Sequence, residues 1–236
     1  MMGVLLILIL LVIYVKNKWN NIYKNEKETY QYYNIFEPHE NMAKVISDIK
    51  NKIPKKTKDI RVLDVGCGVG RNTLPLIEAG FDVYAFDSAP EGIKILQDII
   101  NDKNKKAHLD ILDFTKELPY ETDFFDVVIS VQVLQHGYEE EIKSSIEEIS
   151  RVLNSNGIIF ITLCGRKDKD GKLRYTLVKT AKKVANHTFI PTIGNEKDMP
   201  HFIYNKQLIR KHFERFKIYE MWKDQRNYYC FLGKLK

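Results

Sequence analysis

The segment 62–73, which reads VLDVGCGVGRNT, constrains the fold of this chain more than any other. An apolar run leads into three glycines at alternate positions: Gly66, Gly68 and Gly70. The pattern predicts a buried parallel strand over 60–65 and a helix that begins near Arg71. Glycines between the two elements permit positive φ and a close approach of the backbone to a ligand. Units of this kind bind nucleotide-like molecules at the carboxyl edge of a parallel sheet.

The glycine loop departs from the dinucleotide-binding fingerprint. G-x-G-x-x-G would need a third glycine at position 71, where the chain has Arg71. Asp64 adds a carboxylate at the base of the loop, which repels a pyrophosphate and attracts a ligand that carries an ammonium group. The pattern Asp64-x-Gly66-x-Gly68-x-Gly70 resembles the first motif of class I S-adenosylmethionine-dependent methyltransferases. The alternative is a tight turn between a buried strand and a helix.

A second acid follows the next predicted strand. The run 82–86 ends at Asp87, and a helix is predicted over 90–101. An acid at this point, about 20 residues past the loop, suits hydrogen bonds to ribose hydroxyls. Both Asp87 and Ser88 also suit the N-cap of the helix.

The rest of the chain continues to alternate between strands and helices. We predict strands over 106–109, 124–133, 157–164, 216–222 and 228–235, and helices over 40–52, 139–153 and 205–213. This order predicts an α/β fold with a doubly wound, mostly parallel seven-stranded sheet and an antiparallel C-terminal hairpin. A short apolar helix is expected at the N-terminus.

The resemblance to class I methyltransferases implies S-adenosylmethionine as the cofactor and a set of binding residues: Asp64, Gly66, Cys67, Gly68, Gly70, Asp87, Ser88, Asp110, Ile111, Leu112 and Val131. Asp64 and the glycines are assigned to the methionine end, Asp87 to the ribose, and residues 110–112 to the adenine. Asp113 competes for the adenine amine. Cys67 is interpreted as a small packing residue and not as a nucleophile. No metal site is expected, because the three cysteines have no metal or disulfide spacing.

The segment 130–136, which reads SVQVLQH, indicates the class of methyl acceptor. It lacks the motifs of nucleic-acid amino-methyltransferases and of cytosine-carbon enzymes, and it is similar to small-molecule methyltransferases of the ubiquinone-biosynthesis or tellurite-resistance type. That similarity implies transfer of a methyl group to a small molecule. A membrane anchor that held the pocket near a bilayer would favour an apolar or membrane-associated acceptor such as a quinone precursor or a lipid. His136 and His201 are candidates for a general base, because imidazole titrates near neutrality; capping a helix or ordering a loop is the alternative role.

Other functions stay open at this stage. After residue 164 the chain has 18 Lys and Arg against 7 Asp and Glu, and a basic region of this kind suits RNA, an anionic surface or simple solubility. Methylation of RNA or protein is therefore the alternative within the class, although nucleic acid is not the favoured partner. Outside the class, the alternatives are a non-catalytic cofactor-binding membrane module and a nucleotide-dependent oxidoreductase.

The predicted domain organisation has three parts. Residues 1–20 form a hydrophobic segment, 21–53 a linker and pre-domain helix, and 54–236 the methyltransferase domain. Residues 1–15 are apolar and uncharged, and lysines follow them. The run is shorter than the roughly 20 residues of a spanning helix, but its lysines favour a membrane anchor with the catalytic domain on the cytoplasmic side. The alternative is a cytoplasmic protein whose apolar helix packs on the domain.

Within the domain, the stretch at about 165–204 is predicted to be a lid insertion over the acceptor pocket. Apolar residues at helical spacing predict an amphipathic helix there, with a basic opposite face: Leu173, Leu177, Ala181, Val184 and Ala185.

Overall fold

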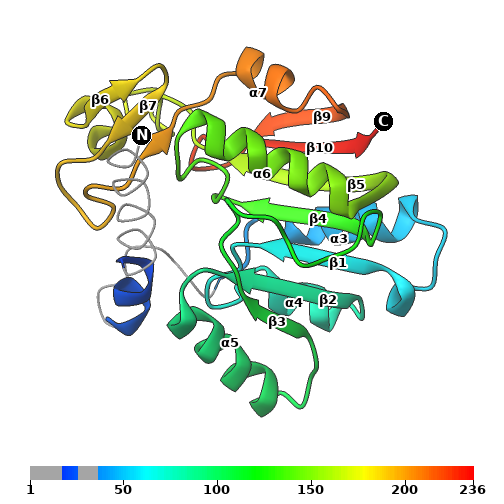
Figure 1. Ribbon diagram of the computed structural model, residues 1–236. Coiled ribbons are helices and arrows are strands. Elements are labelled where there is room, and N and C mark those ends of the chain that lie inside the picture. The colour runs from blue at the N-terminus through cyan, green and yellow to red at the C-terminus, as the bar shows by residue number, and fades with distance from the viewer. Residues whose placement is uncertain (1–17, 26–36) are drawn as a thin grey trace.

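The computed structural model describes residues 18–25 and 37–236. Its main feature is a seven-stranded sheet with the order β3-β2-β1-β4-β5-β10-β9 (Figure 1). The strands are β1 (Arg61–Val65), β2 (Asp82–Asp87), β3 (His108–Ile111), β4 (Phe125–Val131), β5 (Leu153–Leu163), β9 (Phe216–Lys223) and β10 (Tyr229–Leu235). The first five are parallel, and β10 runs antiparallel to both β5 and β9. The predicted sheet with its antiparallel C-terminal hairpin is confirmed.

Helices cover both faces of this sheet. The helices are α3 (Met42–Lys52), α4 (Thr73–Glu78), α5 (Pro90–Asp102), α6 (Glu139–Val152) and α7 (Lys206–His212), with a short 3-10 turn η1 (Thr57–Asp59) before β1. Apolar residues of α3, α4 and α5 pack together on one face, and those of α6 and α7 pack on the other. Strand β4 is buried along its whole length, as expected for a parallel strand covered on both faces.

The insertion between β5 and α7 differs from its prediction. Instead of an amphipathic helix it has a single π-helical turn, η2 (Tyr175–Lys179), and a small antiparallel sheet of β6 (Lys182–Ala185), β7 (Thr188–Ile190) and β8 (His201–Phe202). Leu173 and Val184 are 41% and 39% exposed, so the predicted apolar stripe is not a buried face. The helical turn ends at Lys179, and His187, with a φ of +60°, turns the chain between β6 and β7.

The small sheet lies beside the carboxyl ends of the central strands. Figure 1 shows it at the same end of the large sheet as the helical segment 18–24, drawn in dark blue. Parallel α/β sheets bind their ligands at this end. The arrangement therefore encloses the region where the glycine loop lies.

The predicted membrane-anchored location is corrected by the structure. Within residues 18–25 and 37–236, no helix combines the length and the apolar composition needed to cross a bilayer. The predicted apolar helix and anchor, residues 1–15, lie outside the described residues.

Candidate active site

A pocket lies at the carboxyl ends of β1, β2 and β4. Among its lining residues are eight that the sequence singled out: Gly66, Cys67, Gly68, Asp87, Ser88, Leu112, Val131 and His136. It also includes residues that were not singled out for the cofactor: Trp19, Tyr23, Arg71, Phe86, Phe114 and Gln132. The fold therefore gathers most of the predicted cofactor residues around one cavity.

The glycine loop makes the floor of this pocket. Gly66 and Gly68 have φ values of +71° and +56°, in the left-handed region that favours glycine. The backbone N–H groups of Gly66 and Cys67 both donate to the carbonyl of Phe86 at 2.9 Å, which fixes the loop to the end of β2. Burial, more than the nearby carboxylates, raises the pKa of the Cys67 thiol, so this side chain stays a neutral packing group.

Asp87 presents its carboxylate to the pocket from the end of β2. Its Oδ2 accepts a hydrogen bond from Gly68 N, and its Oδ1 accepts one from Ala89 N, both at 2.9 Å. Burial raises the pKa of this carboxyl, against the effect of backbone donors at Ala89, Gly68 and Ser88. Each carboxylate oxygen can accept a further hydrogen bond, which leaves both oxygens able to bind vicinal hydroxyls.

Asp64 lies beneath the loop and is not among the residues that line the pocket. It is 2% exposed, and its Oδ2 accepts a hydrogen bond of 2.7 Å from Thr73 Oγ1. Burial raises the pKa of Asp64 to about 7, although the Thr73 bond and the Arg71 charge act in the opposite direction.

This raised pKa makes a prediction about stability and pH. The folded protein holds a proton on Asp64 that the unfolded chain releases above about pH 4, so the stability contributed by this group falls as pH rises from about 4 to 7. Asp64→Asn removes the titration and keeps an acceptor for Thr73. We expect the variant to raise the free energy of unfolding by on the order of 2 kcal/mol at pH 8 and by little near pH 4. Urea unfolding at the two pH values measures this, and an equal effect at both would contradict it.

The residues assigned to adenine are only partly brought together. Leu112 lines the pocket, whereas Ile111 is 48% exposed and Asp110 accepts a hydrogen bond of 3.1 Å from Tyr120 Oη. Strand β3 continues to Ile111, two residues past its predicted end, so these two side chains still belong to the strand. Asp113 Oδ1 accepts hydrogen bonds from the backbone N–H and the hydroxyl of Thr115.

Gly70 faces away from the pocket, into the core. A Cβ placed on Gly70 would lie 2.2 Å from Leu96 Cδ1 of α5. The third glycine of the motif therefore lets a helix pack closely against the loop. It is not among the residues that line the cavity.

Arg71 and Gln132 connect the loop to the end of β4. Arg71 Nη2 donates to Gln132 Oε1 at 3.1 Å, and Gln132 has a φ of +63°. Such backbone strain in a residue other than glycine persists where surrounding contacts hold it, often at functional sites. Here the N–H of Gln132 donates to Thr162 Oγ1 at 2.8 Å.

The helical segment 18–24 closes one side of the pocket. Trp19 and Tyr23 both line it, and the Tyr23 hydroxyl lies 2.7 Å from the position of a Cβ on Gly68. The Asn20 side chain accepts a hydrogen bond of 2.9 Å from the N–H of Glu91, which ties the segment to the start of α5. Sequence reasoning missed this contact because it divided the region at residue 20 between a hydrophobic segment and a linker. The aromatic spacing Trp19-x-x-x-Tyr23 was the available signal.

His136 and His201 lie next to each other at the pocket wall. Their ring centroids are 4.8 Å apart, and Trp19 contacts His136 edge-on at 5.5 Å. Burial is the largest influence on His136 and lowers its pKa to about 3. His136 is therefore neutral at physiological pH and a weak proton acceptor in this environment.

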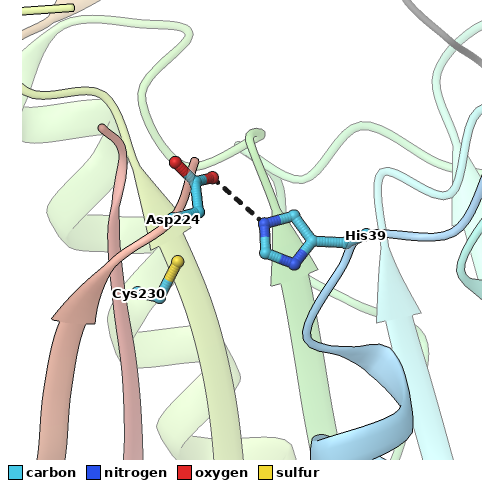
Figure 2. Close-up of side chains that lie close together, drawn as sticks. All are labelled: His39, Asp224 and Cys230. Atoms are coloured by element: carbon cyan, nitrogen blue, oxygen red, sulfur yellow. Dashed lines mark hydrogen bonds and ion pairs between the residues drawn. The ribbon is translucent and has the colours of Figure 1, made fainter. Parts of the chain in front are cut away.

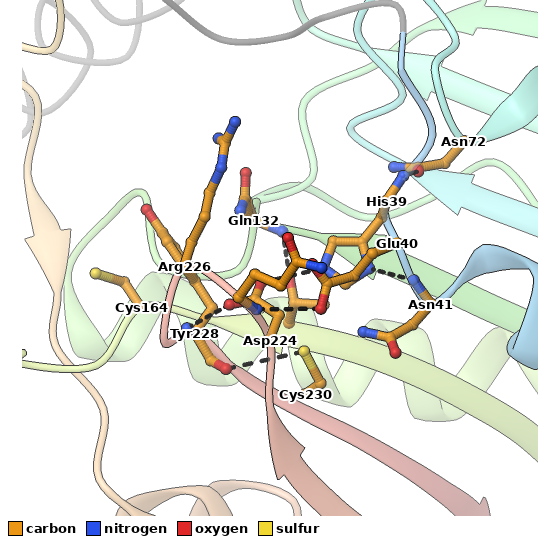
Figure 3. Close-up of polar contacts among 12 residues, drawn as sticks. His39, Glu40, Asn41, Asn72, Gln132, Cys164, Asp224, Arg226, Tyr228 and Cys230 are labelled. Carbon is orange, nitrogen blue, oxygen red and sulfur yellow. Dashed lines mark hydrogen bonds and ion pairs between the residues drawn. The ribbon is translucent and has the colours of Figure 1, made fainter. Parts of the chain in front are cut away.

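A second polar cluster lies beside the glycine loop and couples the pre-domain segment to the C-terminal hairpin. Figure 2 shows the His39 ring facing Asp224, with Cys230 beneath; His39 Nε2 lies 3.1 Å from Asp224 Oδ2. The backbone N–H of His39 donates to Asn72 Oδ1 at 2.9 Å, directly before α4. The wider network in Figure 3 brings in the turn between β9 and β10, where the N–H of Tyr228 donates to Asp224 Oδ1 at 2.8 Å. These bonds fix the start of α4 and hence the loop.

The fold and the pocket define the class of the protein. The sheet is doubly wound with the expected antiparallel C-terminal hairpin, Gly66, Gly68 and Asp87 line the cavity, and a model of the methyltransferase domain matches residues 63–161. Residues 63–161 match the methyltransferase domain family, and the fold and pocket are those of a class I S-adenosylmethionine-dependent methyltransferase, a class whose cofactor is S-adenosylmethionine.

Particular relatives differ in what they methylate. The chain is 30% identical over 118 residues to a ubiquinone biosynthesis O-methyltransferase of Pelagibacter ubique. The aligned region covers 50% of this chain and 48% of the relative. It is 27% identical over 139 residues to a human tRNA N(3)-cytidine methyltransferase, and this aligned region covers 55% of this chain and 37% of the relative. The chain thus matches about half or less of the length of these curated relatives.

A solved structure shows the same fold. The Burkholderia thailandensis 1,6-didemethyltoxoflavin N1-methyltransferase, with bound S-adenosylhomocysteine, has a TM-score of 0.65 at 12% identity over 94% of this chain and 87% of that chain. The likeness extends over nearly the whole chain.

Proposed function

We propose that this protein transfers the methyl group of S-adenosylmethionine to a small-molecule acceptor. The observation that carries the proposal is the buried carboxylate of Asp87 beside the positive-φ glycines of one pocket. The loop glycines let the methionine end of the cofactor approach the backbone closely, and the Asp87 oxygens suit two ribose hydroxyls. The residues present therefore fit the cofactor.

Within that proposal each part of the pocket has a role. Gly66, Gly68 and Cys67 hold the methionine end, Asp87 and Ser88 the ribose, and Leu112 with Phe114 the adenine. Asp64 acts on the methionine end through the loop that it supports, and Gly70 through the packing of α5. The contacts predicted for Asp110, Ile111 and Val131 with the cofactor stay predictions, although Val131 lines the pocket.

Methyl transfer depends more on the alignment of the acceptor with the methyl group than on general acid–base catalysis. The cofactor supplies an activated methyl group on a sulfonium, and the protein must hold a nucleophile in line behind it. The aromatic side chains of Trp19 and Tyr23 make one wall of the pocket and can exclude water from an aromatic or apolar acceptor. We propose that residues 165–204 act as the lid of the acceptor site, as part of a methyltransferase domain over 54–236.

Methylation of RNA is the second candidate function. It is supported by the tRNA-modifying relative and by the excess of basic residues after position 164. A phosphate backbone is bound mainly through such charges. Labelling of transfer RNA by the protein, with no labelling of small molecules, would favour it.

The first test is calorimetric titration of the full chain with S-adenosylmethionine and, separately, with NAD. We expect micromolar binding of S-adenosylmethionine alone, since the loop lacks the dinucleotide spacing and has Asp64 beneath it. Radiolabelled methyl groups offered with phenols, thiols or transfer RNA then identify the acceptor class. Binding of NAD in preference to S-adenosylmethionine would contradict the proposal.

A further inference from the structure

Three potential metal ligands meet at the wall of the pocket. His136 follows β4, His201 begins β8, and Glu196 lies in the loop that connects β7 to β8. One ligand atom from each lies within 4.8 Å of the others. An antiparallel bridge between His136 and His201 holds the two imidazoles in register, so the cluster is built by backbone pairing.

The two imidazoles are buried with unsatisfied nitrogens. Nε2 of His136 and Nε2 of His201 are both inaccessible and have no hydrogen-bond partner among the described residues. Buried polar atoms without partners are rare and call for an explanation such as a bound ion. Glu196 Oε2 lies 3.2 Å from His201 Nε2, and Glu196 Oε1 lies 3.9 Å from His136 Nε2. Both pairs are close, but neither has hydrogen-bond geometry.

The tautomer of His201 directs its free nitrogen into the cluster. His201 Nδ1 lies 2.9 Å from the carbonyl oxygen of Met199, which can only accept, so Nδ1 carries a proton. In the neutral ring the lone pair then lies on Nε2, facing the carboxylate. A carbonyl that fixes the ring in this way is typical of metal-ligating histidines.

We propose that His136, Glu196 and His201 bind one divalent transition-metal ion such as Zn²⁺. Two imidazoles and one carboxylate are a common ligand set for this ion and leave at least one coordination position for another ligand. The ion relieves both unsatisfied nitrogens and the contact of their lone pairs with the carboxylate. Lys18 places a cation near the cluster: its ammonium group donates to the carbonyl of Lys197 and interacts with Glu196, and its charge works against the metal.

The metal ion would activate the methyl acceptor, an inference that rests on the proposed function. His136 lines the cofactor pocket, so an acceptor bound in that pocket would be near enough to the ion to complete its coordination. An acceptor hydroxyl or thiol bound there loses its proton to solvent as the metal lowers its pKa. Its oxygen or sulfur then forms the bond to the methyl carbon while the bond from that carbon to the sulfonium breaks, and the electron pair stays on the sulfur of S-adenosylhomocysteine. The acceptor class would be a phenol, catechol or thiol.

The test titrates the metal-free full chain with Zn²⁺ by calorimetry and with Co²⁺ by absorption spectroscopy. We expect one equivalent to bind, with visible Co²⁺ bands typical of a nitrogen and oxygen site. Glu196→Gln and His201→Gln should weaken binding at least tenfold, whereas His108→Gln, which changes an exposed histidine on β3, should not. Absence of stoichiometric binding by the full chain, or unchanged affinity in both ligand variants, would overturn the proposal.

Two further readouts keep the result unambiguous. Glu196 lies in a loop with its side chain 22% exposed, so Glu196→Gln should fold even if a histidine variant does not. Titration of the same variants with S-adenosylmethionine reports on the cofactor site separately. Retained cofactor binding with lost Zn²⁺ binding supports the metal site, whereas Zn²⁺ binding without cofactor binding would leave the metal site standing and refute the proposed function.

Discussion

Gly70→Ala is expected to lower the free energy of unfolding by about 2–5 kcal/mol. An alanine at a φ of +91° has a conformational cost of roughly 1–2 kcal/mol. Its Cβ would also lie 2.2 Å from Leu96 Cδ1, and overpacking of a core costs about 1–3 kcal/mol more. Leu96 is fully buried, and the backbone at Gly70 is held by hydrogen bonds to Cys67 and Leu74, so neither partner can move freely.

Gly171→Ala is the matched control for this variant. Gly171 also has a positive φ, +76°, but a Cβ there would meet nothing within 4 Å. The difference between the two variants therefore isolates the clash with Leu96 from the conformational cost. Urea unfolding followed by circular dichroism measures both. Equal destabilisation would show that α5 moves away from the loop without cost.

Asp87→Ala is expected to weaken S-adenosylmethionine binding by about 5- to 150-fold, or about 1–3 kcal/mol. The variant removes the carboxylate that would accept hydrogen bonds from the ribose. It also removes the acceptor of Gly68 N, so the loop itself loses a support at the methionine end. Both effects act on the same ligand, and calorimetry measures their sum.

Asp168→Ala is a control for the loss of a carboxylate that accepts backbone hydrogen bonds in a loop away from the pocket. Asp168 Oδ1 accepts two backbone hydrogen bonds, from Asp170 and Lys172, in an exposed loop that does not line the pocket. This variant should bind S-adenosylmethionine as the unchanged protein does. If Asp87→Ala kept the original affinity, the assignment of Asp87 to the ribose would be wrong.

The core of the fold and the centre of the site follow from local patterns. Apolar runs that end at a glycine loop and at Asp87 are read directly from the chain, because a parallel strand buried on both faces needs a continuous apolar segment. The class of cofactor follows from the resemblance that Asp64 and the glycines carry. The boundary of β3 does not follow from the sequence, because hydrophobicity does not show where a strand stops. The strand was predicted to end at residue 109, but it ends at Ile111, so Asp110 and Ile111 belong to it.

Contacts between distant segments were decided by the tertiary structure. The placement of residues 18–24 over the glycine loop, and the small sheet where a helix was predicted, depend on surfaces that the rest of the chain provides. The cluster joins His136 to Glu196 and His201, which lie 60 and 65 positions further along the chain, and no spacing rule connects His136 to the other two. The sequence by itself determined the sheet, the loop and the cofactor class, because each depends on neighbouring residues. Only the tertiary structure decided what closes the pocket and which ligands meet at its wall, because those depend on packing between elements far apart in the chain.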